Sequence, residues 1–457
     1  MNYKFFLIVL VILNIFYTNT IHSATKKKKS KKISSKVVGN YPSTIVLDSL
    51  LDEGVLYKNI LFGKRKNKIS ANILEIKLNS TKNTLEVLKA LDNINELEKL
   101  QQIIRYSDST DRAKTIAAVN GSFWRAAKNN PIGPCIIDGN VIEQNPYKDW
   151  SSCFIDTNGT PFIDNFKLSG SVKLHDGKII NISTTNRRRD SAAVVFYNFY
   201  GGEQIPHLSL NKLEKQIEKS YMDFLQDSTI FVGDSTEQDF SYDSFRSVLI
   251  EQFRAEQLES SIFKAVVEFI DKPGINKKFR AVVNYIDTGT VKINSNQGVL
   301  SLGFFVPPDL YVMTGDTLEF TFYTNVHKEK QFNFALSATP RLVRHGKAGH
   351  EAYIEGSRSR RFINGHLGRT AIGYNQAKDI FYLVTIDHPN SSAGKKGASL
   401  GELAQIMKQI GCYDAMNLDG GGSSIMVIDG KNIMAKYNPE ASRRISVAIG
   451  VRKKDNY

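Results

Sequence analysis

Three consecutive glycines near the end of the chain, Gly420 to Gly422, place the strongest constraint on its fold. Glycine loses more backbone freedom on folding than any other residue, so a triplet indicates a sharp bend or a very close approach. The triplet follows the apolar run Tyr413 to Leu418 and lies between Asp419 and the pair Ser423-Ser424. We therefore expect a strand here that ends in a specialised loop.

The segments around this loop predict an α/β fold. Ala371 to Tyr374 and Ile380 to Ile386 are typical of neighbouring apolar strands. Between them and the glycines, Ser399-Leu400-Gly401-Glu402 forms a capping-box pattern that opens a helix, which Gly411 ends. Helices between apolar strands favour a mixed β-sheet flanked by helices. The prediction for the whole chain is this α/β architecture with a β-rich middle insertion.

The rest of the chain suggests a division into parts. A helical pattern runs from Leu85 to Leu100, and Thr115 to Val119 is typical of a buried strand. Alternating runs such as Thr317 to Phe322 indicate β-structure in the middle, interrupted by helical patterns near 208–226 and 243–264. We expect an N-terminal part at 41–170, a β-rich middle region at 171–335 and a C-terminal part at 336–457.

The start of the chain predicts export. Phe5 to Tyr17 is almost wholly apolar, follows Lys4 and precedes the small residues Ser23-Ala24, which is the layout of a secretory signal over 1–24. The run is short for a membrane span, which needs about 20 residues, although an uncleaved anchor remains an alternative. We expect a periplasmic, cell-surface or secreted protein that contacts a membrane only through such an anchor.

A block of lysines follows the apolar run and carries much of the net charge of +14. It marks 25–40 as a basic linker, because blocks of like charge are usually solvated. Outside it the sequence has no basic run with interleaved aromatic residues, so no nucleic-acid partner is predicted.

The cysteine and histidine patterns predict no metal site and no cofactor. Cys135, Cys153 and Cys412 make an odd count, and their spacings do not resemble a zinc site. One bridge between Cys135 and Cys153 stays open as an alternative in an oxidising compartment.

Two structures fit the glycine loop. Consecutive N–H groups without Cβ atoms can form a nest for an anion, to which Ser423 and Ser424 would add hydroxyl donors. The loop lacks the Gly-Lys-Ser/Thr ending of a nucleotide P-loop, which argues against ATP or GTP. The alternative is a tight hairpin turn, since the residues that follow are strand-like.

An ordered set of motifs resembles the phosphodiester glycosidase family, and the resemblance extends over roughly residues 75 to 451. The motifs are Ala117 to Phe123, Pro134 to Ile142, Asn186-Arg187, Arg189-Asp190, Pro340 to Lys347, Gly368 to Gly373, Val384 to Asp387, the helix at 399–410, Asn417 to Ser424, and Arg443. The resemblance implies hydrolysis at the bond between a sugar's anomeric carbon and a phosphate oxygen.

The resemblance also implies site residues. An oxocarbenium-like transition state requires a carboxylate nearby, and a departing phosphate is stabilised by arginine, so Asp419, Asp387 and Arg369 are expected to be catalytic. The expected substrate- and phosphate-binding residues are Asn120, Gly121, Asp138, Thr370, Gly420, Gly421, Gly422, Ser423, Ser424 and Arg443.

Several of these residues keep a structural alternative. Asp138-Gly139 fits a hairpin turn, and Asn120 can cap a neighbouring loop instead of binding a sugar. Surface salt bridges are the alternative for Arg369 and Arg443. The chain departs from the family after Asp387, where His388-Pro389 replaces the usual glycine and makes the local loop different.

The expected function is hydrolysis of a sugar 1-phosphodiester on an envelope or extracellular phosphate-containing polysaccharide, by an exported hydrolase of the glycosidase class. One alternative is a phosphodiesterase that cleaves the phosphorus–oxygen bond. Another is a non-catalytic protein that binds a polyanionic glycan. A third is a basic surface protein that binds nucleic acid or an acidic polymer through its lysine block.

Overall fold

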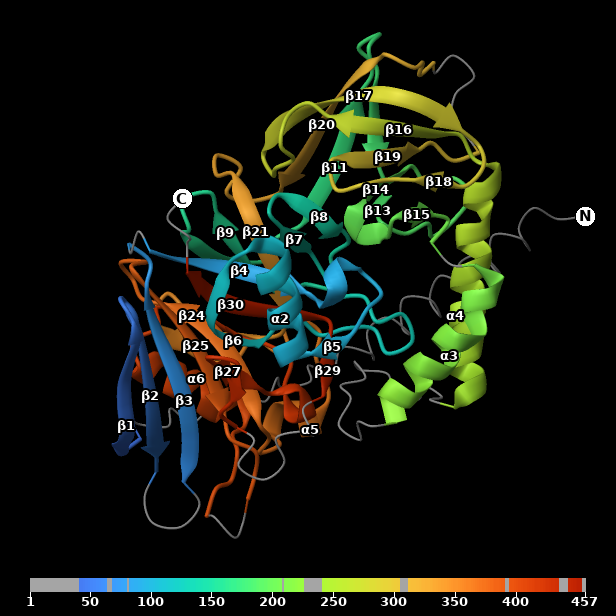
Figure 1. Cartoon of the computed structure of the whole chain (residues 1–457). Helices are drawn as coiled ribbons and strands as arrows, with labels where there is room; N and C mark the ends of the chain where they lie inside the picture. Colours follow the sequence, from blue (N-terminus) through green and yellow to red (C-terminus); the bar gives the residue numbers. More distant parts are fainter. Residues whose placement is uncertain are drawn as a thin grey trace, which may run out of the picture. The chain divides into compact units, whose positions relative to one another are not determined.

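The computed structural model describes residues 41–63, 68–79, 82–207, 209–225, 241–304, 311–390, 394–434 and 443–453 (Figure 1). The predicted signal at 1–24 and the basic linker at 25–40 lie outside the described residues. Among the described helices, none has the length and apolar character that crossing a membrane requires.

Two antiparallel sheets hold the candidate site between them. The first has the strand order β1 (Ser43–Asp52), β2 (Val55–Phe62), β3 (Ile69–Lys77), β25 (Ile380–Ile386), β24 (Arg369–Tyr374), β26 (Asp414–Asn417), β22 (Arg341–Arg344) and β23 (Lys347–Ala348). The second has the order β28 (Lys431–Asn432), β27 (Met426–Ile428), β6 (Lys114–Asn120), β30 (Val447–Lys453) and β4 (Asn83–Lys89).

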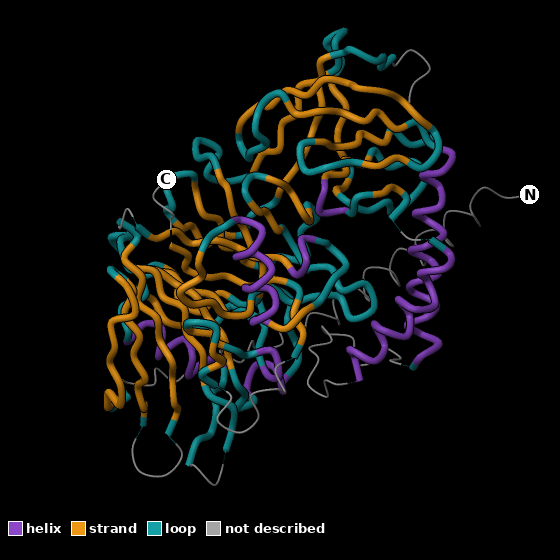
Figure 2. The backbone as a smooth tube through the Cα atoms, viewed as in Figure 1, coloured by secondary structure: helices purple, strands orange, loops and turns teal. Residues whose placement is uncertain are grey.

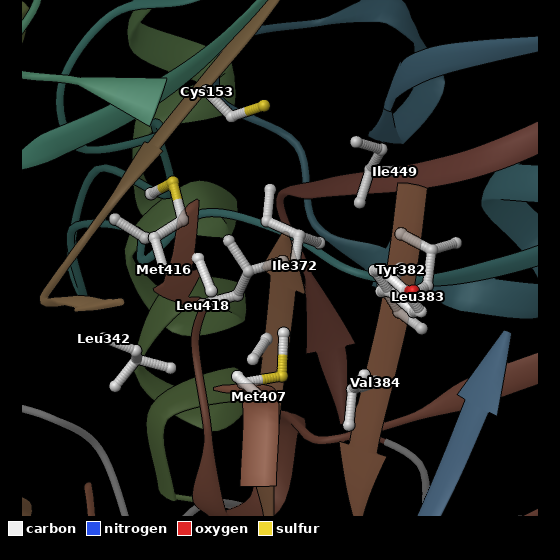
Figure 3. Close-up of a cluster of buried hydrophobic side chains, with 14 of the residues drawn as sticks. Cys153, Leu342, Ile372, Tyr382, Leu383, Val384, Met407, Met416, Leu418 and Ile449 are labelled. Atoms are coloured by element: carbon white, nitrogen blue, oxygen red, sulfur yellow. The ribbon is translucent and has the colours of Figure 1, made fainter. Parts of the chain in front are cut away.

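Alternate residues of the second sheet face two different cores, as the period of two in a strand requires. Val119 and Ile449 join the large cluster that contains Ile372 and Leu383 of the first sheet. Figure 3 shows part of this cluster, with Ile372, Leu383 and Ile449 among the labelled side chains. Ala118, which precedes Val119 in β6, packs instead in a smaller cluster with α2 (Leu100–Asp111). This helix lies against β6 and β4 (Figure 1).

A second β-rich region surrounds an aromatic core that includes Phe279, Phe320 and Phe322. Its larger sheet has the order β12 (Ile179–Ile182), β11 (Leu168–Lys173), β20 (Thr317–Thr324), β17 (Lys277–Asp287), β16 (Lys264–Phe269), β19 (Gln297–Ser301), β14 (Val195–Asn198) and β13 (Thr184–Thr185). Its smaller sheet has the order β10 (Pro161–Asp164), β9 (Ser151–Asp156), β21 (Phe332–Ala338), β7 (Cys135–Ile137) and β8 (Asn140–Glu143).

The remaining elements are short pairs and helices. They are β15 (Gln204–Ile205) with β18 (Val291–Lys292), β29 (Arg444–Ile445) with β5 (Glu98–Lys99), and the helices α3 (Leu210–Leu225), α4 (Tyr242–Gln257), α5 (Arg360–Asn364) and α6 (Leu400–Gln409). Cys135, Cys153 and Cys412 are all buried and free.

The predicted α/β class, a mixed sheet flanked by helices, is wrong. Strands predominate over helices (Figure 2), and β13 with β14 is the one parallel pair among the described strands. The reason lies in the segment that favoured α/β. Helix α6 does connect two strands of the same direction, β25 and β26, but β24 lies between them and pairs antiparallel with each. The large core is shared between sheets, and helices cover only part of it.

Of two predictions for short segments, one is confirmed and one is wrong. The capping box at Ser399 and Glu402 is present and opens α6, so that prediction is confirmed. The helix predicted from Leu85 to Leu100 is wrong, because this stretch forms β4, a single 3-10 turn and β5 before α2 begins. Leu85 and Val87 also fit the alternation of a strand, and pairing with β30 decides between the two periods.

Candidate active site

The sheet topology brings several predicted site residues to one edge. Because β24 is antiparallel to both β25 and β26, its start lies at the ends of those two strands: Arg369 pairs with Ile386, and Ala371 pairs with Asn417. Arg369 begins β24, Asp387 follows β25, and Asp419 lies two residues beyond β26. The facing sheet reaches the same place, since the Asp419 N–H donates to the Gly121 carbonyl, just after the end of β6, at 3.1 Å.

Asn120 joins three segments at this edge with one fully buried amide. Its Nδ2 donates to the Asp419 carbonyl at 2.7 Å. Its Oδ1 accepts from the Thr370 hydroxyl at 2.6 Å and from the Ile425 N–H at 3.1 Å. These bonds use the amide inside the protein, which favours the capping alternative for Asn120 and gives Thr370 the same positioning role.

Gly121 allows two backbones to approach closely. Its N–H donates to the Val447 carbonyl at 2.8 Å, and a Cβ at this position would lie 2.9 Å from that same oxygen. A side chain would therefore push β6 away from β30 and shift the carbonyl that holds Asp419.

The Asp419 carboxyl is buried and held by its own loop. The residue is 6% exposed, and the Gly420 N–H donates to Oδ1 at 2.8 Å. Burial raises the pKa of Asp419 to about 7, and the hydrogen bonds from the Ser423 side chain and the Gly420 backbone oppose this rise. The group is therefore present in both protonation states near neutral pH, which is unusual for an aspartate and typical of a functional carboxyl.

The cation Arg443 bonds to Ser423, which itself bonds to the Asp419 carboxyl. Arg443 donates from Nη1 to the Ser423 hydroxyl at 3.1 Å, and its guanidinium lies over the Trp124 ring, 4.9 Å from the centroid. Burial lowers the pKa of Arg443 to about 9, so it remains charged at neutral pH. Arg443, Ser423 and Asp419 thus form a continuous series of side-chain hydrogen bonds.

The glycine loop bonds mainly to the protein itself. Gly421 adopts a φ of +58°, which favours glycine, within a 3-10 turn over Gly421–Ser423. The Gly421 N–H donates to Gly368, and those of Ser423 and Ser424 donate to Gly420 and Gly421. With the Gly420 N–H on Asp419, these donors fix the carboxyl and the turn, so an anion would have to displace them to use the loop as a nest.

The Ser424 hydroxyl differs from these backbone groups. It is buried and has no hydrogen-bond partner among the described residues. A buried hydroxyl without a hydrogen bond costs free energy. A hydrogen bond to a polar group of a ligand would remove that cost.

Arg369 is almost fully buried and contacts three backbone carbonyls. Its Nη2 donates to Phe362 at 2.7 Å and to Gly365 at 2.9 Å, and its Nε donates to Ala398 at 2.9 Å. Burial lowers its pKa to about 10. The guanidinium therefore ties α5 and the segment before α6 to the start of β24, while its backbone lies against Gly420.

Asp387 is paired rather than open to a ligand. Its Oδ1 accepts from the Asn72 side chain at 2.9 Å, and Oδ2 is paired with Lys395. The neighbouring His388, where this chain departs from the family, packs its ring against Gly368 and hydrogen-bonds to the Ser424 backbone. Partial burial lowers the pKa of His388, so it is mainly neutral at pH 7.

Asp138 occupies the turn between β7 and β8. Asp138 and Gly139 both have positive φ, at 47° and 78°, and the Asp138 carboxylate pairs with Lys272 at 2.7 Å. The hairpin-turn alternative for this pair is confirmed.

Sequence reasoning missed other charged residues near the site. Lys395, which pairs with Asp387, lies in a loop without any pattern. Arg125 and Lys128 follow Trp124 but were assigned no role, because single basic residues in a loop carry no signal of their own. Among the described residues, no group of three or more His, Cys, Asp or Glu side chains could hold a metal ion.

Comparison with known proteins agrees with the resemblance predicted from the motifs. The phosphodiester glycosidase family model matches residues 273–452, which include the Asp419 loop and Arg443. N-acetylglucosamine-1-phosphodiester alpha-N-acetylglucosaminidase from Bos taurus is 27% identical over 182 residues, or 36% of this chain and 33% of that protein. The Mus musculus protein of the same name is 27% identical over 156 residues, or 32% of this chain and 28% of that protein. The chain thus spans about a third of the length of these curated relatives.

Solved structures share the fold over most of the chain. A protein of Synechocystis has a TM-score of 0.59 at 19% identity, and the match covers 90% of this chain and 64% of that one. A protein of Burkholderia pseudomallei described as exported has a TM-score of 0.56 at 14% identity, covering 91% of this chain and 97% of that one.

Proposed function

We propose that this chain is a hydrolase of the phosphodiester glycosidase type, which cleaves a sugar 1-phosphodiester between the anomeric carbon and the phosphate oxygen. The observation that carries the proposal is the Asp419 carboxyl, buried at the meeting point of two sheets and hydrogen-bonded through Ser423 to Arg443. A carboxylate beside a buried cation provides the two charges that this reaction requires.

The chemistry divides between these two side chains. As the bond between C1 and oxygen breaks, its electron pair moves to the phosphate oxygen, and positive charge develops on the sugar ring. Ionised Asp419 stabilises that charge and accepts the proton of the water whose oxygen becomes bonded to C1. Arg443 stabilises the negative charge on the departing phosphate. A phosphate monoester leaves readily, so protonation by a strong general acid is not needed.

Several of the other predicted site residues position this pair. Asn120, Thr370 and Gly121 hold the Asp419 backbone, and Arg369 holds the start of β24 beside Gly420. Asp387 anchors the end of β25 through Asn72 and Lys395. The Ser424 hydroxyl, which has no hydrogen-bond partner among the described residues, is available to a substrate group.

We propose one interrupted catalytic domain, with the 41–170 and 336–457 parts on either side of a 171–335 insertion. The support is that both sheets at the site combine the two parts. Strand β3 pairs with β25, and β6 pairs with β27 and β30.

We also propose an exported protein that acts on a phosphate-containing glycan of the envelope or cell exterior. The apolar start of the chain supports export. So does the likeness in fold to a Burkholderia protein described as exported.

The pH dependence of the reaction follows from the state of Asp419. Because the ionised carboxylate is the active form and burial raises its pKa to about 7, kcat/KM should rise as pH increases through about 7. The measurement is kcat/KM from pH 5 to 9 with a sugar 1-phosphodiester. The variant His388→Gln should keep the same ascending limb, which separates Asp419 from the nearby histidine. A rate that falls as pH rises through 7 would contradict the assigned role.

Arg443→Lys should lower kcat/KM by a factor of about 100 with little loss of stability. Lysine keeps the charge but lacks the planar fork that contacts both Ser423 and the Trp124 ring. Steady-state kinetics on the phosphodiester measure this loss, and Arg344→Lys, a half-exposed pair with Glu351, serves as the control. An equal fall in kcat/KM in Arg443→Lys and Arg344→Lys would contradict a specific role for Arg443.

The activity itself is tested with a panel of sugar 1-phosphodiesters and phosphorus NMR. Wild-type protein should release a phosphate monoester of the aglycone, and Asp419→Asn should not. Phosphate that stays on the sugar would identify a phosphodiesterase. Binding without any product across the panel would identify a glycan-binding protein.

A further inference from the structure

Two arginines face one buried carboxylate, and two further basic side chains come from the loop that follows β6. Arg187 donates from Nη2 to Glu143 Oε2 at 2.5 Å, and Arg189 Nη2 lies 3.6 Å from Glu143 Oε1. Arg125 and Lys128 lie in the loop after β6, and burial, followed by the charges on Arg187 and Arg189, lowers the pKa of each. We call Arg125, Lys128, Arg187 and Arg189 the cationic cluster.

The cationic cluster carries more positive charge than its carboxylates balance. Glu143, 1% exposed, faces Arg187, 4% exposed, and Arg189. Asp190 and Glu251 oppose the lowering of the pKa values of Arg189 and Lys128, respectively, so four cations have three carboxylates acting on them. Burial lowers the pKa of Lys128 to about 8, and the charges on Arg187, Arg125 and Arg189 contribute to this lowering. Like charges held together away from water are costly, so an anion among them would be bound favourably.

A specific donor in the cluster also lacks an acceptor. Arg187 Nη1 is buried and has no hydrogen-bond partner among the described residues, although Nη2 of the same guanidinium is bonded to Glu143. An unpaired buried donor on a charged group costs more than a neutral one. A ligand oxygen placed between Arg187 and its cationic neighbours would remove this cost.

One loop connects the cluster to the proposed catalytic residues. Arg125 follows Trp124, whose ring lies under Arg443, and Arg443 bonds to the Ser423 hydroxyl. On the other side, the Arg125 N–H donates to the Asn130 carbonyl at 2.9 Å, and the Asn130 side chain donates to Glu143 at 3.2 Å. One loop, 124–130, therefore links the cluster to the site.

We propose that Arg125, Lys128, Arg187 and Arg189 form an anion-binding subsite that holds a phosphate group of the substrate. Tetrahedral phosphate oxygens match the fork of a guanidinium, and the phosphodiester of the proposed substrate carries the negative charge that this cluster lacks. The place of this subsite in turnover rests on the proposed function, whereas its affinity for phosphate does not.

Binding of inorganic phosphate to the full-length Asp419→Asn protein, measured by isothermal titration calorimetry at pH 7, tests the subsite without turnover. Adding Lys128→Gln or Arg125→Gln should weaken binding about tenfold each, because each removes one cation from a small cluster. These half-buried positions are chosen because replacing buried Arg187 could unfold the chain. The matched control is Lys278→Gln, an exposed lysine of β17 paired with Glu319, which should leave the affinity unchanged.

Kinetics with the otherwise wild-type chain then place the subsite in the reaction. Lys128→Gln should raise KM for a sugar 1-phosphodiester about tenfold, and inorganic phosphate should compete with that substrate. The subsite would be overturned if the cluster variants bound phosphate as tightly as the Asp419→Asn protein does. It would also be overturned if Lys278→Gln weakened phosphate binding as much as the cluster variants do. Cluster-dependent binding in a protein with no turnover would keep the subsite and overturn the proposed function. Normal KM in Lys128→Gln would overturn its place in the reaction.

Discussion

Asp419→Asn is expected to abolish turnover and, at the same time, to stabilise the fold at neutral and alkaline pH. The loss of the carboxylate should lower kcat on the order of 10³- to 10⁴-fold, as removal of a charged member of a catalytic set does. The gain in stability follows from the cost of burying a charge that asparagine does not carry. Opposite signs for activity and stability are the mark of a residue kept for function.

The sign of the stability effect follows from the two pKa values. The folded pKa of Asp419, about 7, is above that of an unfolded aspartate, about 3.9. Between these values the folded protein binds more protons than the unfolded chain, so wild-type stability falls as pH rises from about 4 to about 7. Above pH 7 the full cost applies, at most about 4 kcal/mol for a shift of this size. The Asp419→Asn variant would not show this loss, because its amide does not ionise.

Urea unfolding at pH 5 and pH 8 measures the effect. The variant should exceed the wild type by more at pH 8 than at pH 5. Asp176→Asn, at an exposed turn, is the control and should change neither activity nor the difference between the two pH values. An Asp419→Asn protein with activity within tenfold of wild type would remove Asp419 from the mechanism.

Arg369→Lys is expected to act mainly on stability, with a loss of about 3 kcal/mol in the free energy of unfolding. Lysine cannot reach the Phe362, Gly365 and Ala398 carbonyls together, so buried acceptors lose their charged donor. Activity per folded molecule should fall much less than in Asp419→Asn. Urea midpoints and kinetics on the same samples separate these effects.

The same experiment decides between this role and direct phosphate contact by Arg369. If the guanidinium bound substrate, KM would rise strongly while the urea midpoint stayed close to that of wild type. Arg344→Lys breaks only a half-exposed pair with Glu351 and should cost about 1 kcal/mol or less.

Short-range signals in the sequence predicted the local features around the site. The capping box at Ser399 and the turn at Asp138-Gly139 depend on backbone geometry within a few residues, and both are present. The same holds for the strand that precedes the glycine loop, which became β26. Such features need no knowledge of distant partners.

Long-range pairing could not be predicted in the same way. The insertion of β24 between β25 and β26 turns an apparent α/β unit into an antiparallel sheet, and no local pattern encodes it. For the same reason the motifs identified Asn120 and Arg369 but not their partners. An amide and a guanidinium look alike in sequence whether they bind a ligand or the protein's own carbonyl groups.

The central claim is that the bond between C1 and oxygen breaks at Asp419, and hydrolysis in ¹⁸O-labelled water tests it most directly. Cleavage of either bond to the bridging oxygen gives the same two products, but the label goes to different atoms. The account predicts that the released phosphate monoester contains no ¹⁸O by mass spectrometry, with no product from Asp419→Asn. One ¹⁸O in that phosphate would show attack at phosphorus and contradict the account.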